Sequence, residues 1–561
     1  MIYKTLHGYI LRELLRIFLL TAAALTTLLA FGGTFKPLTK EGIDVGQLML
    51  ILLNLMPAML AYAIPLAALF AAVLVYWRLS TDNEITACRA GGVSFWAIVM
   101  PALLLGLIVA SADLVFVNYV VPVFLQRAEE TVRRDLGTLL VHNIARQEPF
   151  EFEHLVVYAD DGQQHAVPKS ETPEGVDERT IVVLHGMAAT QLDKDKKAAV
   201  IIVARQANVI IDQFRRKNEV HIVVQLEDGS AFDPQRNFQK VSGTIRSLPP
   251  EGFFPVPSFF QDKPKFLNFY QLRKLEENVT LYGPVAEIQT SILQAQAHQE
   301  TAQRYLDKWQ RDKVLRFDQN GTDYFIVRSP TAVLDVERQL IFNRAPADPV
   351  QIDQYRNGRM VNIYRCDTVS FLLADDSLLS RGPAVAEYGT LQLSGNVVRQ
   401  DLVLGIPPAP GEKMVALQPL IVPPEMVVPL PQGLDVKALQ RSSATMTPSV
   451  LAMVGDLRTK ITKLVQSIGA ELHSRGSFAL SCLTLVLLGA ALGIEMRGRN
   501  PLVVFVVGFV PAIVLVLLIT AGRKMVESSG ISVTMGYAII WAGNLLLLAL
   551  VAGVYARLLR H

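Results

Sequence analysis

The sequence contains few of the residues that build disulfide frameworks, metal centres or charged binding surfaces. It has only three cysteines, Cys88, Cys366 and Cys482, and they lie far apart, so neither a disulfide framework nor a CxxC metal pair is available. Charged residues make up 19% of the chain, the formal net charge is +2, and no basic cluster with interleaved aromatic residues occurs. The composition therefore does not indicate a nucleic-acid partner.

The short motifs of common catalytic sites are missing as well. The sequence has no GxxxxGK(S/T) phosphate-binding loop, no HExxH pair and no GxSxG nucleophile turn. Its nine histidines are scattered rather than grouped with cysteines at metal-ligand spacing. We therefore expect no catalytic residues, no metal site and no cofactor, and no nucleotide site of the phosphate-loop type.

Apolar residues, by contrast, are abundant and make up 51% of the chain. Six segments reach the roughly 18 residues that a membrane-spanning helix needs. The first is too long for a typical signal peptide, and Glu13 lies among the arginines that precede it, so we expect an uncleaved helix. The predicted spans are about Ile17–Phe35, Leu48–Trp77, Phe95–Val121, Ser477–Ile494, Leu502–Ala521 and Met535–Leu559.

The short loops between these spans differ in their content of lysine and arginine. One side collects nine such residues and the other collects four, when the long middle segment is left out. Because the side richer in lysine and arginine faces the cytoplasm, we expect both termini there and the large middle segment outside. The nine are Lys4, Arg12, Arg16, Arg78, Arg89, Arg497, Arg499, Arg557 and Arg560, and the four are Lys36, Lys40, Arg523 and Lys524.

The external segment alternates between β-rich and helical composition. Val- and Ile-rich runs with Asp-Gly turns predict strands over 151–233 and again over 323–398, whereas 265–314 has helical spacing. Prolines clustered over 407–431 are typical of a stiff linker. We therefore divide the chain into 1–122 with three spans, a first β domain at 123–250, a helical segment at 251–313, a second β-rich unit at 314–402, a Pro-rich linker at 403–445, a helix leading to the membrane at 446–473, and three spans at 474–561.

Two separated stretches resemble one protein family. The stretch "NLMPAMLAYAIPLAALFAAVLVYWRLSTDNEITACRAGGVS", with its double proline, is similar to the second span and first cytoplasmic loop of the lipopolysaccharide-export permeases (the LptF/LptG family). The stretch "ELHSRGSFALSCLTLVLLGAALGI" is similar to the beginning of the same family's fourth span. The resemblance covers the six spans and, more loosely, the β region at 150–235.

The resemblance implies a function and a set of partners. It implies an α+β membrane protein of the bacterial inner membrane, with six transmembrane helices in a 3+3 arrangement and a periplasmic β-jellyroll between the third and fourth. Such a chain is the non-catalytic permease subunit of an ABC exporter. Its partners are a cytoplasmic ATPase dimer, a second permease chain that is either a copy of itself or a related chain, and a periplasmic bridge protein. Its cargo is lipopolysaccharide or a related glycolipid.

This sequence departs from the family pattern in its larger external domain. The excess lies at about 296–445 and contains the second β set, which itself resembles the open β folds of the bridge proteins. Two other functional classes stay open: a membrane-anchored periplasmic binding or scaffold protein without transport, and an external enzyme.

Four cations flank the outer ends of the first and fifth spans, where the family opens its lateral gate. Lys36 and Lys40 follow the first span, and Arg523 and Lys524 follow the fifth. We expect them to bind the phosphate or carboxylate groups of an anionic glycolipid through charge-assisted hydrogen bonds. Ordinary interfacial snorkelling of long cationic side chains is the alternative.

The first β domain is expected to enclose an apolar groove for acyl chains. A plain sandwich core would use the same residues, and a register error of one residue would turn each of them to the other face. The candidate lining residues are Val156, Val182, Val200, Ile202, Val209 and Ile211.

The loop at about 81–91 has the features of a short helix. Thr81 or Asp82 can cap it, Glu84 suits the positive end of its dipole, and Gly91 and Gly92 end it. Ile85, Cys88 and Arg89 share one face. The resemblance implies the coupling helix that fits into a groove of the ATPase, with Glu84 in a polar or ionic contact and Arg89 in support. A merely solvated loop is the alternative.

Overall fold

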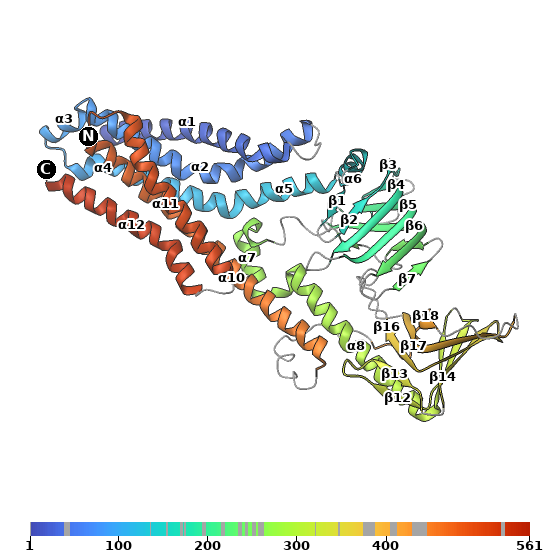
Figure 1. Ribbon diagram of the computed structural model, residues 1–561. Coiled ribbons are helices and arrows are strands. Elements are labelled where there is room, and N and C mark those ends of the chain that lie inside the picture. Colours follow the sequence, from blue (N-terminus) through green and yellow to red (C-terminus); the bar gives the residue numbers. More distant parts are fainter. Residues whose placement is uncertain are drawn as a thin grey trace.

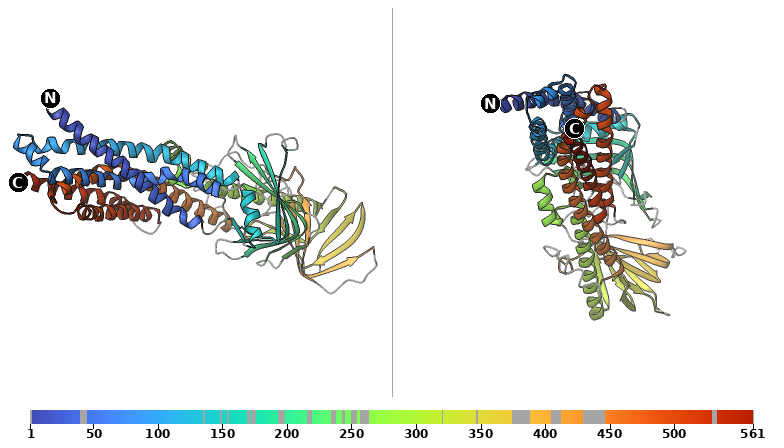
Figure 2. Two further views of the ribbon diagram at one scale, coloured as in Figure 1. Left: turned by 90° about the horizontal axis from the view of Figure 1, so that it is seen from above. Right: turned by 90° about the vertical axis from the view of Figure 1, so that its left-hand side faces the viewer.

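The computed structural model describes most of the chain. The described residues are 2–38, 45–134, 136–147, 149–152, 155–168, 172, 176–192, 198–214, 219–233, 238–241, 245–248, 254–255, 263–319, 321–345, 348–373, 388–403, 412–428, 446–528 and 533–560. Helices form an elongated bundle at one end of the molecule, and two β units lie at the other (Figures 1 and 2).

Within the described residues, six helices are long and apolar enough to cross a membrane, as predicted. They belong to α1 (Ile2–Leu38), α2 (Val45–Thr81), α4 (Phe95–Val115) with its continuation, α10 (Pro448–Glu495), α11 (Pro501–Glu527) and α12 (Val533–Arg560). The fold is thus an α+β membrane protein with three spans on each side of the β units. Both termini lie at the end of the bundle that is remote from the β units (Figure 1).

The third span runs on further than its apolar stretch suggests. After α4 the chain passes through a π-helical turn, η1 (Phe116–Val120), into α5 (Val121–Arg134) and α6 (Leu136–Ala145). The first β domain was predicted to begin at 123, but its first strand begins only at Phe150. α6 nevertheless belongs to this domain, because Leu140 and Ile144, one helical turn apart, pack into the core of the first β sheet.

The first β unit is an antiparallel sheet dominated by three long strands, β4 (Glu178–Leu192), β5 (Ala198–Phe214) and β6 (Glu219–Asp233). Along β4 the buried side chains stand at even-numbered positions up to Leu184 and at odd-numbered positions from Met187 onward. The alternation is interrupted at Gly186, whose φ is positive at 62°. The shorter strands are β1 (Phe150–Phe152), β2 (Leu155–Tyr158), β3 (Asp161–Ala166), β7 (Phe238–Val241), β8 (Ile245–Leu248) and β9 (Phe254–Pro255).

A helical arm connects the two β units. It consists of η3 (Pro264–Phe266), α7 (Phe269–Glu277), η4 (Val279–Leu281) and α8 (Gly283–Asp312). Asn268 and Gln271 form a capping box that starts α7, with Asn268 Oδ1 accepting from the Gln271 N–H at 2.7 Å. Apolar side chains of α8 then pack against the outer half of α10, so the two helices form a stalk (Figure 1).

The second β unit contains a closed ring. Strand β17 pairs with β15 and with β18, and the path β15–β14–β11–β10–β18 returns to it, with β10 and β18 joined through the single pair Asp318–Ile421. β16 pairs with the same edge of β17 as β15 does, and β13 and β12 continue from β16. The strands are β10 (Val314–Asp318), β11 (Tyr324–Arg328), β12 (Thr331–Leu334), β13 (Leu340–Asn343), β14 (Val350–Arg356), β15 (Arg359–Cys366), β16 (Thr368–Leu373), β17 (Tyr388–Asp401) and β18 (Glu412–Ile421).

β18 corrects the prediction of a Pro-rich linker at 403–445. Leu417 and Leu420 are buried in the core of the ring, and this burial outweighs the flanking prolines. Pro419 is tolerated because it falls at a register irregularity between the Leu417 and Leu420 pairings with β17. The chain then reaches α10, a single helix of 48 residues that also joins the helix predicted at 446–473 to the fourth span without a break.

Candidate functional sites at the two ends of the bundle

The first candidate site is the short helix α3 (Glu84–Ala90), which lies at the end of the bundle where both termini are found (Figure 1). Thr81 and Asp82 do not cap it, because α2 continues helically through Thr81; the N-cap is Asn83, whose φ of 63° is left-handed. The helix ends as predicted: the Gly91 N–H donates to Ala87 O at 2.9 Å, and Gly92 takes a positive φ of 80°.

The two faces of α3 have different surroundings. Ile85 is only 7% exposed and packs into a membrane-domain core that includes Tyr76 and Leu79, and half-buried Cys88 packs against the same cluster. These two side chains therefore hold α3 on the bundle and do not face outward with Arg89. Arg89 is exposed and Glu84 is half-buried, while the outer surface between them is formed by Thr86, Ala87 and Ala90.

A second loop fixes the position of α3. Arg497, in the turn that follows α10, donates through Nη2 to Asn83 Oδ1 and through Nη1 to Thr86 Oγ1 at 3.3 Å. In the adjoining α2, the Ser80 hydroxyl donates to Ile494 O at 3.3 Å. Sequence reasoning assigned Arg497 only to the positive side of the membrane, because a partner 414 residues away in the chain leaves no local signal.

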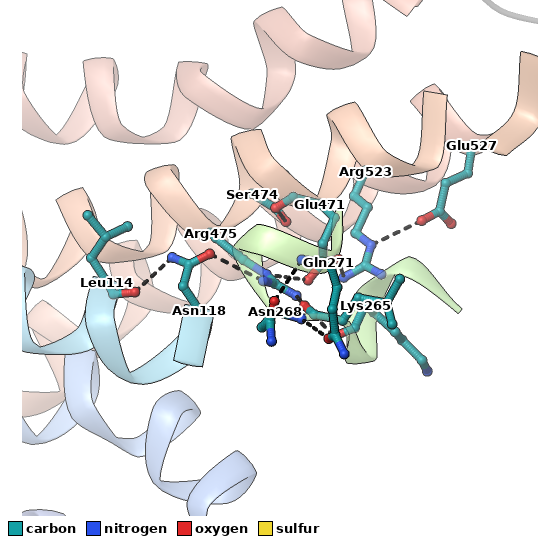
Figure 3. Close-up of polar contacts among 11 residues, drawn as sticks. Leu114, Asn118, Lys265, Asn268, Gln271, Glu471, Ser474, Arg475, Arg523 and Glu527 are labelled. Carbon is teal, nitrogen blue, oxygen red and sulfur yellow. Dashed lines mark hydrogen bonds and ion pairs between the residues drawn. The ribbon is translucent and has the colours of Figure 1, made fainter. Parts of the chain in front are cut away.

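The second candidate site lies at the opposite end of the bundle, around Arg475 of α10 (Figure 3). The Arg475 side chain is 3% exposed, and its Nε donates to Glu471 Oε1 at 2.9 Å. Its Nη1 donates to Asn118 Oδ1 at 3.2 Å, and Asn118 in turn donates to Leu114 O in α4 at 2.7 Å. Through Nη2 it donates to Lys265 O at 3.2 Å and Leu267 O at 2.9 Å.

Arg475 thereby joins three elements, namely α10, η1 and the η3 turn of the helical arm. We call Glu471, Arg475, Asn118 and Arg523 the polar hub. The π-helical turn places the Asn118 side chain in the hub, as π-helical turns often do at functional positions. The Glu-to-Arg spacing of four residues was visible in "ELHSR", but the burial of the pair was not.

The predicted cations at this end have different environments. Arg523 pairs with two carboxylates, through Nη1 with Glu471 Oε2 at 2.7 Å and through Nε with Glu527 Oε1 at 3.1 Å. Its charge is therefore compensated within the chain (Figure 3). Lys524 is exposed. Lys36 lies in α1 with its side chain outside the described residues, and Lys40 lies wholly outside them.

Further cations gather beside the hub. Lys265 has a pKa below its ordinary value, first because it is partly buried and then because Lys263 and Arg523 are close and positive. Its Nζ lies 4.5 Å from the centre of the Phe266 ring, which contributes to that burial. Positive charge at this end of the bundle therefore comes from the helical arm as well as from α11.

The proposed acyl-groove residues separate into two groups. Val182, Ile202, Val209 and Ile211 are buried together in one core with α6. Val156 pairs with Thr190, whereas its neighbour Val157 packs against that core, so the expected register of β2 is shifted by one residue. Val200 lies in β5 opposite Gln191, and its side chain is outside the described residues. The groove stays a prediction beside the packed-core alternative.

Together these features define a polytopic membrane protein whose β units are inserted between its third and fourth spans. The chain belongs to the family described as lipopolysaccharide export system permease LptF/LptG, which it matches over residues 8–312 and 422–557. This confirms the resemblance seen in the sequence. A comparison with curated proteins finds no match.

The unmatched segment, 313–421, coincides with the second β unit from β10 to β18. The predicted excess at 296–445 was therefore too wide at both ends, because α8 belongs to the matched part up to residue 312.

Proposed function

We propose that this chain is the permease subunit of an ABC exporter that extracts lipopolysaccharide or a related glycolipid from the bacterial inner membrane. The family match carries the proposal, and the arrangement of α3 and the β units at opposite ends of the bundle supports it. ATP hydrolysis takes place in a separate cytoplasmic ATPase dimer. The glycolipid leaves through the first β unit towards a periplasmic bridge protein.

The proposed orientation places α3 and both termini in the cytoplasm and the β units in the periplasm. The excess of lysine and arginine in the loops at the α3 end supports it. Aromatic residues typical of membrane interfaces occur at both ends of the bundle. Trp96 stacks on Tyr555 near α3, and at the other end Trp541 donates to His473 Nδ1 at 3.2 Å.

The coupling role is proposed for α3. Glu84 makes a polar or ionic contact with the ATPase, Arg89 supports it, and the small Ala87 and Ala90 let the partner's surface approach. Ile85 and Cys88 act from the inner side, because their packing transmits force on α3 to the membrane helices. The turn at Gly91 sets where α3 ends and α4 begins.

The glycolipid's headgroup is proposed to bind at the other end of the bundle. Lys524 is exposed there. Lys36 and Lys40 come directly after the predicted first span, on the same predicted side of the membrane as Lys524. Arg523 contributes to the site as a member of the polar hub and not as a free cation, since its two carboxylate partners already compensate its charge. A second permease chain, a copy or a relative, completes the cavity.

The test is reconstitution. The chain is co-expressed with its candidate ATPase, purified in detergent, and placed in vesicles that contain lipopolysaccharide. ATP-dependent release of lipopolysaccharide to a soluble periplasmic acceptor is the expected result. A chain that binds lipopolysaccharide but neither retains the ATPase nor releases lipid on ATP addition would be a scaffold, and the transport proposal would be wrong.

A further inference from the structure

One helix reaches from the coupling end of the molecule to the second β unit. α10 has 48 residues and so rises about 72 Å, more than twice the roughly 30 Å of a bilayer's hydrocarbon core. The turn that follows it carries Arg497, which holds α3 through Asn83 and Thr86. A displacement of α3 therefore acts directly on the cytoplasmic end of α10.

The inner half of α10 is interlocked with α2, the helix that leads into α3. A Cβ atom on Gly489 would lie 2.8 Å from Leu69 O, and one on Gly493 would lie 2.8 Å from Trp77 N. The two glycines are four residues apart and bring backbone against backbone, which is how small residues hold membrane helices together. α2 and the inner half of α10 must consequently move as one body.

The outer half of α10 is fastened to the second β unit through α8. Val285 and Ile292 of α8 pack with Val450 and Leu457 of α10. Near the start of α10, the amide Nε2 of Gln299 donates to Thr447 Oγ1 at 2.8 Å.

The second β unit also holds both helices of the stalk. The Ser449 N–H donates to Glu337 Oε2 of the second β unit at 3.3 Å. Tyr305 and Trp309, at the far end of α8, lie in the core of that unit, and Tyr305 stacks on Phe317 with ring centres 5.4 Å apart. The second β unit is therefore fixed to α10 rather than suspended on a linker.

We propose that α10 is a lever that converts displacement of α3 into displacement of the second β unit, 313–421. The lever rests on the proposed function, because the ATPase supplies the displacement. The polar hub is its pivot, since it connects the middle of α10 to η1, η3 and α11 through side chains instead of interlocked backbones. From Pro448 to Arg475 the helix advances 27 residues, about 40 Å, so a tilt of about 10° would move its outer end by about 7 Å.

Pulsed electron paramagnetic resonance on the full complex with the ATPase tests this directly. One nitroxide is placed at the exposed Val333 of the second β unit and the other at Tyr158 of the first. Cys88 is replaced by the similarly sized serine, and lipid export by this background is measured first, because Cys88 packs beneath α3. The distance between them should shift when the nucleotide-free complex is trapped with ADP and vanadate. The distance from Val333 to a label at Thr459 of α10 should stay constant, because both positions belong to the lever.

The helix supplies matched variants. Gly489→Ala inserts a methyl group against the backbone of α2 and should abolish the shift, whereas Gly455→Ala, with nothing within 4 Å of the new Cβ, should keep it. If Gly489→Ala does not assemble, Thr459→Pro breaks α10 at an exposed position within the stalk, on the hub side of Val450 and Leu457. It should abolish the shift at Val333, and Thr459→Ala should retain it.

The outcomes separate the two proposals. A complex that binds the ATPase and exports lipid while the distance from Val333 to Tyr158 stays unchanged overturns the lever alone. A Gly489→Ala or Thr459→Pro complex that keeps the wild-type shift also overturns it. A chain that does not associate with the ATPase overturns the proposed function and the lever with it.

Discussion

Glu471 and Arg475, one turn apart on α10, form an ion pair of 2.9 Å in which both side chains are nearly inaccessible to solvent. The pair persists in this buried position because further polar groups compensate both side chains. Arg475 also donates to Asn118 and to two carbonyls of the helical arm, and Glu471 is shared with Arg523. Removing Arg475 takes one of two cations from the buried Glu471 and leaves the acceptors on Asn118, Lys265 and Leu267 without this donor, which costs more than the intact pair contributes.

Replacing Arg475 by methionine should therefore destabilise the protein by about 3 kcal/mol, the usual effect of breaking a buried pair. The apparent melting temperature in detergent measures this effect. Arg458→Met, at an exposed position of the same helix, is the control and should melt like the wild type. Equal melting temperatures for the two variants would contradict the structural role of the hub.

Arg497→Ala should weaken association with the ATPase about fivefold, because about 1 kcal/mol of hydrogen bonding that orders α3 is lost. Affinity for the ATPase, measured by microscale thermophoresis in detergent, checks this. Arg499→Ala removes an equal charge from the same turn but leaves the bond from Trp77 Nε1 to Arg499 O, which is a backbone contact of 2.7 Å. If both variants lose affinity for the ATPase equally, the loss comes from the removed charge and not from the position of α3.

Glu84→Ala should reduce both ATPase association and lipid export, and Glu84→Arg should reduce them further because it reverses the charge at the proposed contact. Co-purification and export in vesicles are the two measurements. Asp82→Ala, two residues earlier and exposed, provides the comparison. Unchanged association and export in both Glu84 variants would exclude the coupling role.

Lys524→Glu should lower photocrosslinking to lipopolysaccharide, since it replaces an exposed cation near the headgroup by a carboxylate. Lys460→Glu, on the exposed outer part of α10, carries the same charge change away from that site. The proposed headgroup site is refuted by equal crosslinking yields in the two variants.

The thiols should differ in reactivity. Burial, reinforced by the Asp367 carboxylate, raises the pKa of Cys366 to about 12. At pH 8 this side chain is then a thiolate in about one molecule in 10,000, so alkylation is suppressed; reactivity returns only as the pH approaches 12. Half-buried Cys88 should react with a maleimide at pH 8 while Cys366 does not, as peptide mass spectrometry would show. Labelling in denaturant, where both react, is the control.

The sequence by itself determined the six spans, the two β-rich regions and the end of α3 at Gly91 and Gly92. These features depend on local properties: the length of an apolar run, the alternation of side chains along a strand, and the φ angles that glycine permits. The family resemblance was equally visible, because its motifs are contiguous.

Only the tertiary structure decided which residues meet. Ile85 faces inward because α2 and α4 provide an apolar surface for it, although its spacing with Arg89 predicted that the two share one face. Arg523 is compensated by Glu471, which lies 52 positions earlier, and β18 forms a strand because Leu417 and Leu420 complete a core built from distant strands. Tertiary packing determines which distant residue a side chain contacts, and the periodicity of the sequence, which reports only local structure, does not predict that contact.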